Sequence, residues 1–220
     1  MSGTDKAPVV CALCGFKHLR WVHHEHQRTY WSCERCQLVQ VSPTQWCSPA
    51  EAKAVYDQHE QDVYSEGHRR FLARTLQPLR AALPPPAQGL DFGSGPAPTL
   101  ATWLREEGYQ VSIYDELYAP HPEVLNAQYD FITATEVLEH LQQPLVWLDT
   151  LWECLKPGGV LVIQSKRVLS EDHLAKWHYL RDPTHIIFFR LATWQWMAQH
   201  WQTPVQLCAS DVVLLRKPLG

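Results

Sequence analysis

The 220-residue sequence lacks any long uninterrupted run of apolar residues. Its polar N-terminus has no apolar stretch like the core of a secretory signal, and no segment approaches the roughly 20 apolar residues of a membrane-spanning helix. The sequence also lacks an excess of positive charge, because its formal net charge is −4 at pH 7. We therefore expect a cytoplasmic protein in a reducing compartment, without a broad electrostatic grip on nucleic acid.

Two C-x-x-C pairs stand near the N-terminus. Cys11 and Cys14 form the first pair and Cys33 and Cys36 the second, and histidines and aromatic residues alternate between them as in a small hairpin. Four thiolates at this spacing are typical of a tetrahedral structural zinc site. So small a module buries little apolar surface, and zinc would contribute on the order of 10 kcal/mol to its folding. We therefore predict a small zinc ribbon over residues 1–46, which zinc removal would unfold without loss of secondary structure elsewhere.

A helical lid or linker is predicted over residues 47–86. Ser48-Pro-Ala-Glu51 combines a capping serine, a proline in the first turn and a glutamate three residues after the cap, which indicates a helix start. We expect a short helix to about Tyr56, an irregular stretch over 57–67 and a longer helix over 68–83.

Strand and helix patterns alternate through residues 87–220. This order predicts an α/β fold with a doubly wound, Rossmann-like, mostly parallel sheet and an antiparallel C-terminal strand. The predicted elements are strands 89–93, 110–114, 129–134 and 160–165, helices 98–107 and 143–155, and a closing pair of strands at 205–208 and 212–216.

The first strand of this region runs directly into a glycine loop, within Gly89-Leu-Asp-Phe-Gly-Ser-Gly-Pro-Ala97. Gly93 and Gly95 have no side chain, so the backbone can approach a ligand closely, and the following helix points its partly positive N-terminus at that ligand. Asp115 ends the second strand, where a carboxylate can accept hydrogen bonds from both ribose hydroxyls. The loop therefore predicts an adenine-type cofactor.

With the 129–136 strand and Leu155-Lys-Pro-Gly-Gly159, this arrangement resembles the class I S-adenosylmethionine (SAM)-dependent methyltransferases over about residues 50–217. A nicotinamide-dependent dehydrogenase is the alternative for a strand–glycine–helix unit, but it would want a third glycine where Ala97 stands. The resemblance implies that SAM contacts a set of eight residues: Tyr56, Asp91, Gly93, Ser94, Gly95, Asp115, Thr135 and Glu136.

Within that set, the resemblance implies that Asp91 steers the loop and the cofactor's ammonium group. It also implies that the segment before the core folds over the cofactor. Tyr56, His59 and Tyr64 would then be lid residues, and the alternative is that they are exposed side chains of helix and loop.

Only thirteen residues separate Asp115 from the strand that begins at Tyr129. A helix and a third strand normally occupy this interval in the family and need a longer chain. We predict that the helix is missing and that the edge strand is absent or vestigial. Leu117, Tyr118 or the lid would then form one wall of the adenine pocket.

Glu136-Val-Leu-Glu139-His140 resembles the E-x-x-E-H motif of polyprenyl-quinol O-methyltransferases and small-RNA 2′-O-methyltransferases, which add a second histidine after the fifth strand. His185 offers that histidine here. The resemblance implies that Glu136, Glu139, His140 and His185 hold a divalent cation, which would lower the pKa of a bound hydroxyl. Two alternatives remain open: proton transfer by His140 or His185 without a metal, and a purely structural hydrogen-bonding role.

Trp177-His178-Tyr179 lies where such enzymes build their acceptor pocket. An aromatic pair around an imidazole would suit a ring-bearing acceptor, with His178 as general base. Trp177 could instead join a core face, which is the prediction for the helically spaced Trp194, Met197, Ala198 and Trp201.

We therefore predict a SAM-dependent methyltransferase with an N-terminal zinc ribbon, acting on an oxygen of a small, aromatic or ring-bearing molecule. One alternative is an RNA methyltransferase whose ribbon, with its slight basic excess, recognises the RNA. The other is a non-catalytic SAM-binding or zinc-ribbon scaffold, which Ala97 and the shortened 116–128 region would suit.

Overall fold

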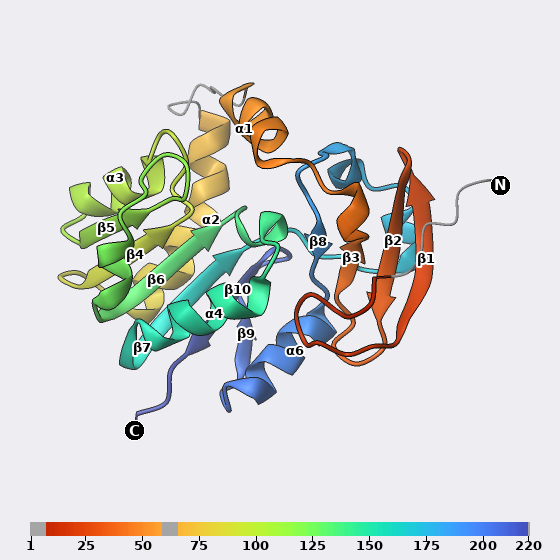
Figure 1. Ribbon diagram of the computed structural model, residues 1–220. Coiled ribbons are helices and arrows are strands. Elements are labelled where there is room, and N and C mark those ends of the chain that lie inside the picture. The colour runs from red at the N-terminus through yellow and green to blue at the C-terminus, as the bar shows by residue number, and fades with distance from the viewer. Residues whose placement is uncertain (1–7, 59–65, 220) are drawn as a thin grey trace.

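The computed structural model describes residues 8–58 and 66–219, so the predicted lid residues His59 and Tyr64 lie outside the described residues. The described chain contains two β-sheets, the smaller drawn on the right and the larger on the left of Figure 1. The smaller sheet consists, in spatial order, of β1 (Leu19–Glu25), β2 (Arg28–Cys33), β3 (Val39–Val41) and β8 (Ile187–Phe188).

The predicted hairpin between the cysteine pairs is confirmed as the antiparallel pair β1–β2. His26 and Gln27 turn the chain with φ angles of 50° and 60°, the left-handed conformation that two-residue hairpin turns require. β3 extends this sheet, and Val39 of β3 then pairs with Phe188 of β8. The sequence gives no sign of this last pairing, which joins the N-terminal sheet to the C-terminal half of the chain.

The larger sheet confirms the predicted Rossmann-like architecture. Its first four strands are parallel, and its last two are antiparallel to their neighbours. In spatial order the strands are β5 (Gln110–Tyr114), β4 (Gln88–Phe92), β6 (Tyr129–Thr135), β7 (Leu155–Gln164), β10 (Val212–Arg216) and β9 (Val205–Leu207).

β7 begins five residues earlier than predicted, because the Lys156-Pro-Gly-Gly159 segment stays within the strand. The register against β6 shifts between Tyr129 and Phe131, so this segment forms an irregularity rather than a separate turn. Gly158, at φ 80°, supplies the left-handed residue that the irregularity needs.

Helices cover both faces of the larger sheet, as the doubly wound prediction requires (Figure 1). Phe131 packs with α2 and α3, whereas its neighbour Ile132 packs with α4 and α6, because successive side chains of a strand point to opposite faces. The helices are α1 (Pro49–Gln58), α2 (Glu66–Ala82), α3 (Thr99–Glu106), α4 (Pro144–Glu153), α5 (Glu171–Leu174) and α6 (Leu191–His200). Short 3₁₀ helices are η1 (Pro43–Gln45), η2 (Pro122–Asn126), η3 (Leu138–His140) and η4 (His178–Arg181).

The predicted start of α1 is confirmed. The Ser48 backbone N–H donates to Glu51 Oε2 over 2.8 Å, and the Glu51 N–H donates to Ser48 Oγ over 3.3 Å. These reciprocal bonds satisfy two backbone donors that a helix start otherwise leaves free. The helix continues to Gln58, two residues beyond the predicted end.

The shortened third-strand region is also confirmed. Residues 116–128, all of them described, form an isolated bridge between Asp115 and Ala119 and then η2, with no α-helix and no strand. A parallel strand beyond β5 would need a crossover of a dozen or more residues in addition to the strand itself. β5 is therefore the edge of the larger sheet.

The N-terminal segment shares a hydrophobic core with the rest of the chain. Leu13 and Leu38 are fully buried and belong to the same cluster as Ile187 and Trp194. The predicted face of α6 is confirmed as part of this cluster, but Trp177 is not part of it: Trp177 packs in a separate cluster with Tyr30. The predicted domain boundaries at 46 and 86 stay predictions. Residues before position 46 share one hydrophobic cluster with residues after it.

Over residues 8–58 and 66–219, none of the helices combines the length and the apolar character that crossing a bilayer demands.

Candidate active site

A cavity of about 740 Å³ opens at the carboxyl ends of β4, β5 and β6. In doubly wound sheets this edge is where ligands bind. Side chains from α1, α2, the glycine loop and the segment after β7 meet there. Its lining comprises Tyr56, Gly67, His68, Phe71, Phe92, Gly93, Gly95, Pro96, Tyr114, Asp115, Glu116, Leu117, Tyr118, Glu136, Val137, His140, Leu141, Lys166, Asp182 and His185.

The glycine loop is shaped by two different constraints. Gly93 has φ 72°, and a Cβ atom built on it would lie 2.3 Å from Val137 Cγ2, so neither its conformation nor its surroundings accept a side chain. Gly95 has φ 64°, but a Cβ there would meet no atom within 4 Å. Gly95 therefore faces open space in the cavity, where backbone can approach a ligand.

Asp115 organises the adjacent wall. Its Oδ2 accepts a hydrogen bond from the Gly95 N–H over 2.9 Å, and its Oδ1 accepts from the N–H groups of Leu117 (2.9 Å) and Tyr118 (3.1 Å). The Tyr118 hydroxyl then donates to Asp57 Oδ1 of α1 over 2.7 Å. Residues 116–118 of the loop after β5 thus line the cavity.

Three predicted cofactor residues lie behind the cavity rather than along its lining. Asp91 is 3% exposed and accepts a hydrogen bond from Thr133 Oγ1 over 2.8 Å, and its burial raises the pKa of its carboxyl to about 7. Thr135 Oγ1 lies 3.3 Å from Thr75 Oγ1 of α2. The buried Ser94 hydroxyl has no hydrogen-bond partner among the described residues.

Glu136 does line the cavity, at φ 49°, which is a strained conformation for a glutamate. Burial, with the nearby Glu139 carboxylate, raises the pKa of Glu136 to about 8. The Tyr179 hydroxyl lies 3.0 Å from Glu136 Oε2 and also bonds to Glu139 Oε1. One hydroxyl proton cannot serve both carboxylates, so a proton held by Glu136 near neutral pH satisfies the arrangement. Glu136 Oε1 is buried without a hydrogen-bond partner among the described residues.

The two predicted histidines are brought together, with ring centroids 4.8 Å apart. His140 Nδ1 lies 3.1 Å from the Thr184 carbonyl, and His185 Nδ1 lies 2.9 Å from the Tyr179 carbonyl. Because a carbonyl only accepts, each Nδ1 carries the proton and each Nε2 keeps a lone pair when the ring is neutral. Burial lowers the pKa of His185, which favours the neutral ring.

Glu139, His140 and His185 can each direct one ligand atom toward a common point, since these atoms lie within 4.8 Å of one another. Glu136 is not one of this group, although Tyr179 links it to Glu139. Metal-ligating histidines typically donate their other ring N–H to a carbonyl or carboxylate that fixes the ring, as both Nδ1 groups do here. The donor set therefore fits a divalent cation.

His178 is placed elsewhere. It is exposed on η4 and is not among the cavity-lining residues, and Trp177 is buried against the N-terminal sheet. The geometry gives no support to His178 as a base. The sequence predicts Tyr179 as an aromatic side chain of the acceptor pocket, whereas the structure places its hydroxyl against Glu136 and Glu139. Lys166 was not predicted: it lines the cavity, and its Nζ lies 4.9 Å from the centre of the Tyr179 ring.

The four N-terminal cysteines converge as predicted. Cys11 Sγ lies 3.6 Å from Cys36 Sγ, and Cys14 Sγ lies 3.5 Å from Cys33 Sγ. A tetrahedral site with Zn–S bonds of about 2.3 Å separates its sulfurs by about 3.8 Å. The cluster is consistent with a four-thiolate zinc ribbon.

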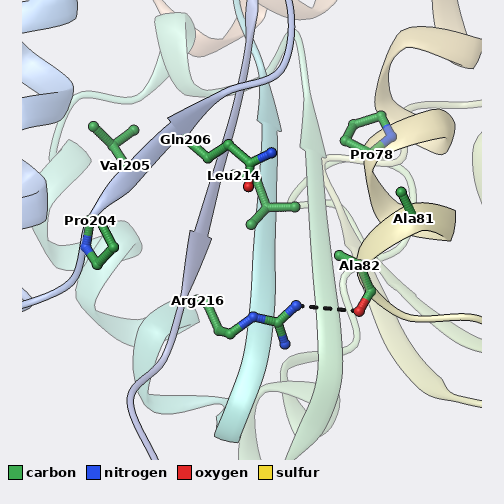
Figure 2. A pocket seen from close by; sticks show the side chains of 8 residues that line it. All are labelled: Pro78, Ala81, Ala82, Pro204, Val205, Gln206, Leu214 and Arg216. Atoms are coloured by element: carbon green, nitrogen blue, oxygen red, sulfur yellow. Dashed lines mark hydrogen bonds between the residues drawn. The ribbon is translucent and has the colours of Figure 1, made fainter.

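A second hollow of about 380 Å³ lies between the end of α2 and the β9–β10 edge (Figure 2). Among the described residues that line it, Arg216 is the only ionisable one, and its guanidinium donates to the carbonyls of Ala82 and Gly158. This hollow therefore offers neither an acid nor a base for chemistry.

Comparison with known proteins identifies the family. Residues 64–202, more than half of the chain, match the family described as Methyltransferase domain, and the chain belongs to that family. Ubiquinone biosynthesis O-methyltransferase of Escherichia coli O127:H6 is 34% identical over 71 residues, which are 32% of this chain and 30% of that protein. The Shewanella pealeana protein of the same description is 24% identical over 111 residues, 46% of this chain and 47% of the relative. The matches thus span less than half of these curated relatives.

Solved structures show the same fold. The 1,6-didemethyltoxoflavin-N1-methyltransferase of Burkholderia thailandensis, solved with 1,6-didemethyltoxoflavin and S-adenosylhomocysteine, has a TM-score of 0.50 at 16% identity, with 90% of this chain and 99% of that chain covered. An O-methyltransferase family protein from the same organism has a TM-score of 0.50 at 13% identity, covering 76% and 59%. The fold is that of a class I SAM-dependent methyltransferase.

Proposed function

We propose that the protein transfers a methyl group from SAM to an oxygen atom of a small, ring-bearing molecule. The observation that carries the proposal is one cavity lined by two chemically different groups of residues. The glycine loop and Asp115 form the first group, called here the first end, and the imidazoles of His140 and His185 form the second group, called the second end. The ubiquinone biosynthesis O-methyltransferases among its relatives support oxygen as the acceptor atom.

The first end supplies what a nucleoside with a short polar tail requires. The open space beside Gly95 admits the tail of SAM close to backbone. Three backbone N–H groups already donate to Asp115, which can accept a further hydrogen bond from a ribose hydroxyl with its remaining lone pair. Leu117 and Tyr118 offer a wall for the adenine, and Tyr56 of α1 covers the cavity next to His140. Asp91, Ser94 and Thr135 would act from behind the loop.

The second end suits deprotonation of a hydroxyl. Methyl transfer from a sulfonium is an in-line displacement, so the protein mainly aligns the two substrates and holds the acceptor oxygen in its nucleophilic state. A neutral imidazole with its proton fixed on Nδ1 presents Nε2 as a base. Asp182 Oδ2 lies 3.6 Å from His185 Nε2 and would stabilise the imidazolium that forms.

In a cation-bound form, Glu139, His140 and His185 would hold a divalent cation, with Glu136 close by. The Nε2 lone pairs would then bind the cation, which would lower the pKa of a bound hydroxyl in place of an imidazole base. We also propose that the four cysteines bind structural zinc and that the protein works in the cytoplasm, where thiols stay reduced. The cavity is open, which favours a cofactor-binding enzyme over a scaffold.

RNA is the weaker candidate acceptor. The basic excess of the ribbon region includes Arg28 and Arg20, but Arg28 is buried and Arg20 is paired with Glu171. These two arginines therefore add little to an exposed basic surface, and the net charge of −4 gives no general attraction to phosphates.

The test is an acceptor screen with methyl-labelled SAM over phenols, catechols and a short RNA. We expect label on a phenolic or catecholic oxygen, and we expect His140→Ala to reduce the rate roughly 100-fold or more, in the range of general-base catalysis. Label transferred only to RNA, or full activity in His140→Ala and Glu139→Ala after stringent chelation, would contradict the proposed chemistry.

A further inference from the structure

The histidines of the site both depend on one short segment, residues 182–186. The Thr184 carbonyl of this segment accepts the Nδ1 proton of His140 over 3.1 Å, and His185 itself belongs to the segment. The Ile186 N–H donates to the Glu139 carbonyl over 2.9 Å. Any displacement of this segment would therefore turn both rings at once.

The zinc-ribbon region holds the same segment from its other side. Arg28, the first residue of β2, donates from Nη1 to the Asp182 carbonyl over 2.9 Å and from Nη2 to the His185 carbonyl. The Val41 N–H at the end of β3 donates to the Ile186 carbonyl over 2.9 Å. The ribbon thus holds this segment by hydrogen bonds from the Arg28 side chain and from the backbone of β3.

Arg28 is an unusual residue for a merely structural role. It is 7% exposed, and its burial lowers the pKa of its guanidinium. Among the residues that the structure describes, Arg28 forms no ion pair within 4 Å, and its buried Nε has no hydrogen-bond partner. Apart from the two carbonyls, the guanidinium faces the Tyr30 ring, whose centre lies 5.7 Å from Arg28 Cζ. Burying a charge without a carboxylate partner is costly compared with an apolar side chain of similar size.

We infer that Arg28 is a positioning residue of the candidate active site. Its guanidinium fixes the backbone of residues 182–185. This backbone carries the His185 ring, whose Nδ1 proton goes to the Tyr179 carbonyl, and it accepts the Nδ1 proton of His140. The ribbon then supports the backbone that holds the two catalytic-site histidines, in addition to binding zinc. The effect of Arg28 on catalysis rests on the proposed function. Its effect on the orientation of the His140 and His185 rings does not.

The experiment follows the imidazole Nδ1–H groups by NMR in the full zinc-loaded chain, with the signals assigned from single His→Gln variants. In Arg28→Met we expect the Nδ1–H groups of His185 and His140 to exchange with water at least tenfold faster than in the unmodified chain. Arg28→Lys keeps a cation that can donate to these carbonyls and should give an intermediate rate. Arg20→Met removes an exposed arginine of the same sheet and should change neither signal.

A second readout separates this inference from the proposed function. Binding of S-adenosylhomocysteine by Arg28→Met should stay within about twofold of the unmodified chain, because the glycine loop lies on other elements. Failure of the unmodified chain to bind this nucleoside would overturn the proposed function and leave the ring measurement valid. Unchanged exchange of both rings in Arg28→Met would overturn the inference. If Arg28→Met does not fold, unchanged exchange in Arg28→Lys would overturn it equally.

Discussion

The Gly95 N–H and the Asp115 carboxylate are joined by a hydrogen bond of 2.9 Å, which makes the glycine loop and the end of β5 one unit. We predict that Asp115→Ala weakens SAM binding roughly 5- to 150-fold, corresponding to about 1–3 kcal/mol for lost charge-assisted hydrogen bonds. Calorimetric titration measures the change. Glu116→Ala is the matched control, because Glu116 also lines the cavity and should leave affinity nearly unchanged. Equal affinities in both variants would refute the ribose role of Asp115.

Alanine substitutions of the two loop glycines should change different properties, thermal stability at Gly93 and SAM affinity at Gly95. Gly93→Ala combines a left-handed backbone with a clash against Val137, so we predict a lower thermal unfolding temperature. Gly95→Ala carries only the backbone strain, roughly 1–2 kcal/mol, but its methyl group enters open cavity space. Gly95→Ala should therefore lose more SAM affinity than stability. Thermal unfolding and SAM titration of both variants check this order, and the reverse order would contradict the assignment of the open space to the cofactor.

Removal of zinc should destabilise the whole chain rather than the N-terminal segment alone. The sequence suggested an independent ribbon, but Cys36 and Leu38 are fully buried in the cluster that contains Trp194. We predict that Cys36→Ser loses stoichiometric zinc and lowers the unfolding temperature in a single cooperative transition. Far-UV circular dichroism and zinc analysis test this. Two separated transitions, with the second unchanged from the unmodified chain, would show that the ribbon is independent after all. Cys208→Ser is the matched control, since Cys208 is outside the cysteine cluster.

Asp91 predicts a pH dependence of stability. Its pKa of about 7 in the folded chain lies above the ordinary 3.8, because burial disfavours the charged carboxylate. The folded state therefore holds a proton that the unfolded state releases, and stability is lost as the pH rises from about 4 through 7. Asp91→Asn keeps an acceptor for Thr133 and should show a smaller fall of unfolding temperature between pH 5 and pH 8. Identical pH profiles of the two proteins would mean that Asp91 is ionised in the fold.

Local patterns were sufficient for most of the fold. The helix start at Ser48 depends on neighbouring residues, and the missing third strand follows from a count of thirteen residues, so both could be predicted. The pairing of β3 with β8 could not, because it joins residues nearly 150 positions apart and β8 is only two residues long.

In the candidate site too, features that depend on local motifs could be predicted, and features that depend on long-range packing could not. Motif spacing brought His140 and His185 together correctly, since both follow strands of one sheet edge. The role of Tyr179 between two carboxylates could not be predicted, because it depends on the direction of η4. The same turn of η4 exposes His178, which the sequence analysis had favoured. In the sequence Arg28 is only one of the basic residues of the ribbon region, and its contact with residues 182–185 is visible only in the structure.

The most direct test of the account is calorimetric titration of the unmodified, zinc-loaded chain with SAM and with S-adenosylhomocysteine. The account predicts that one molecule of either compound binds per chain, and that S-adenosylhomocysteine competes with SAM for the same site. A folded, zinc-loaded chain that binds neither compound would contradict it.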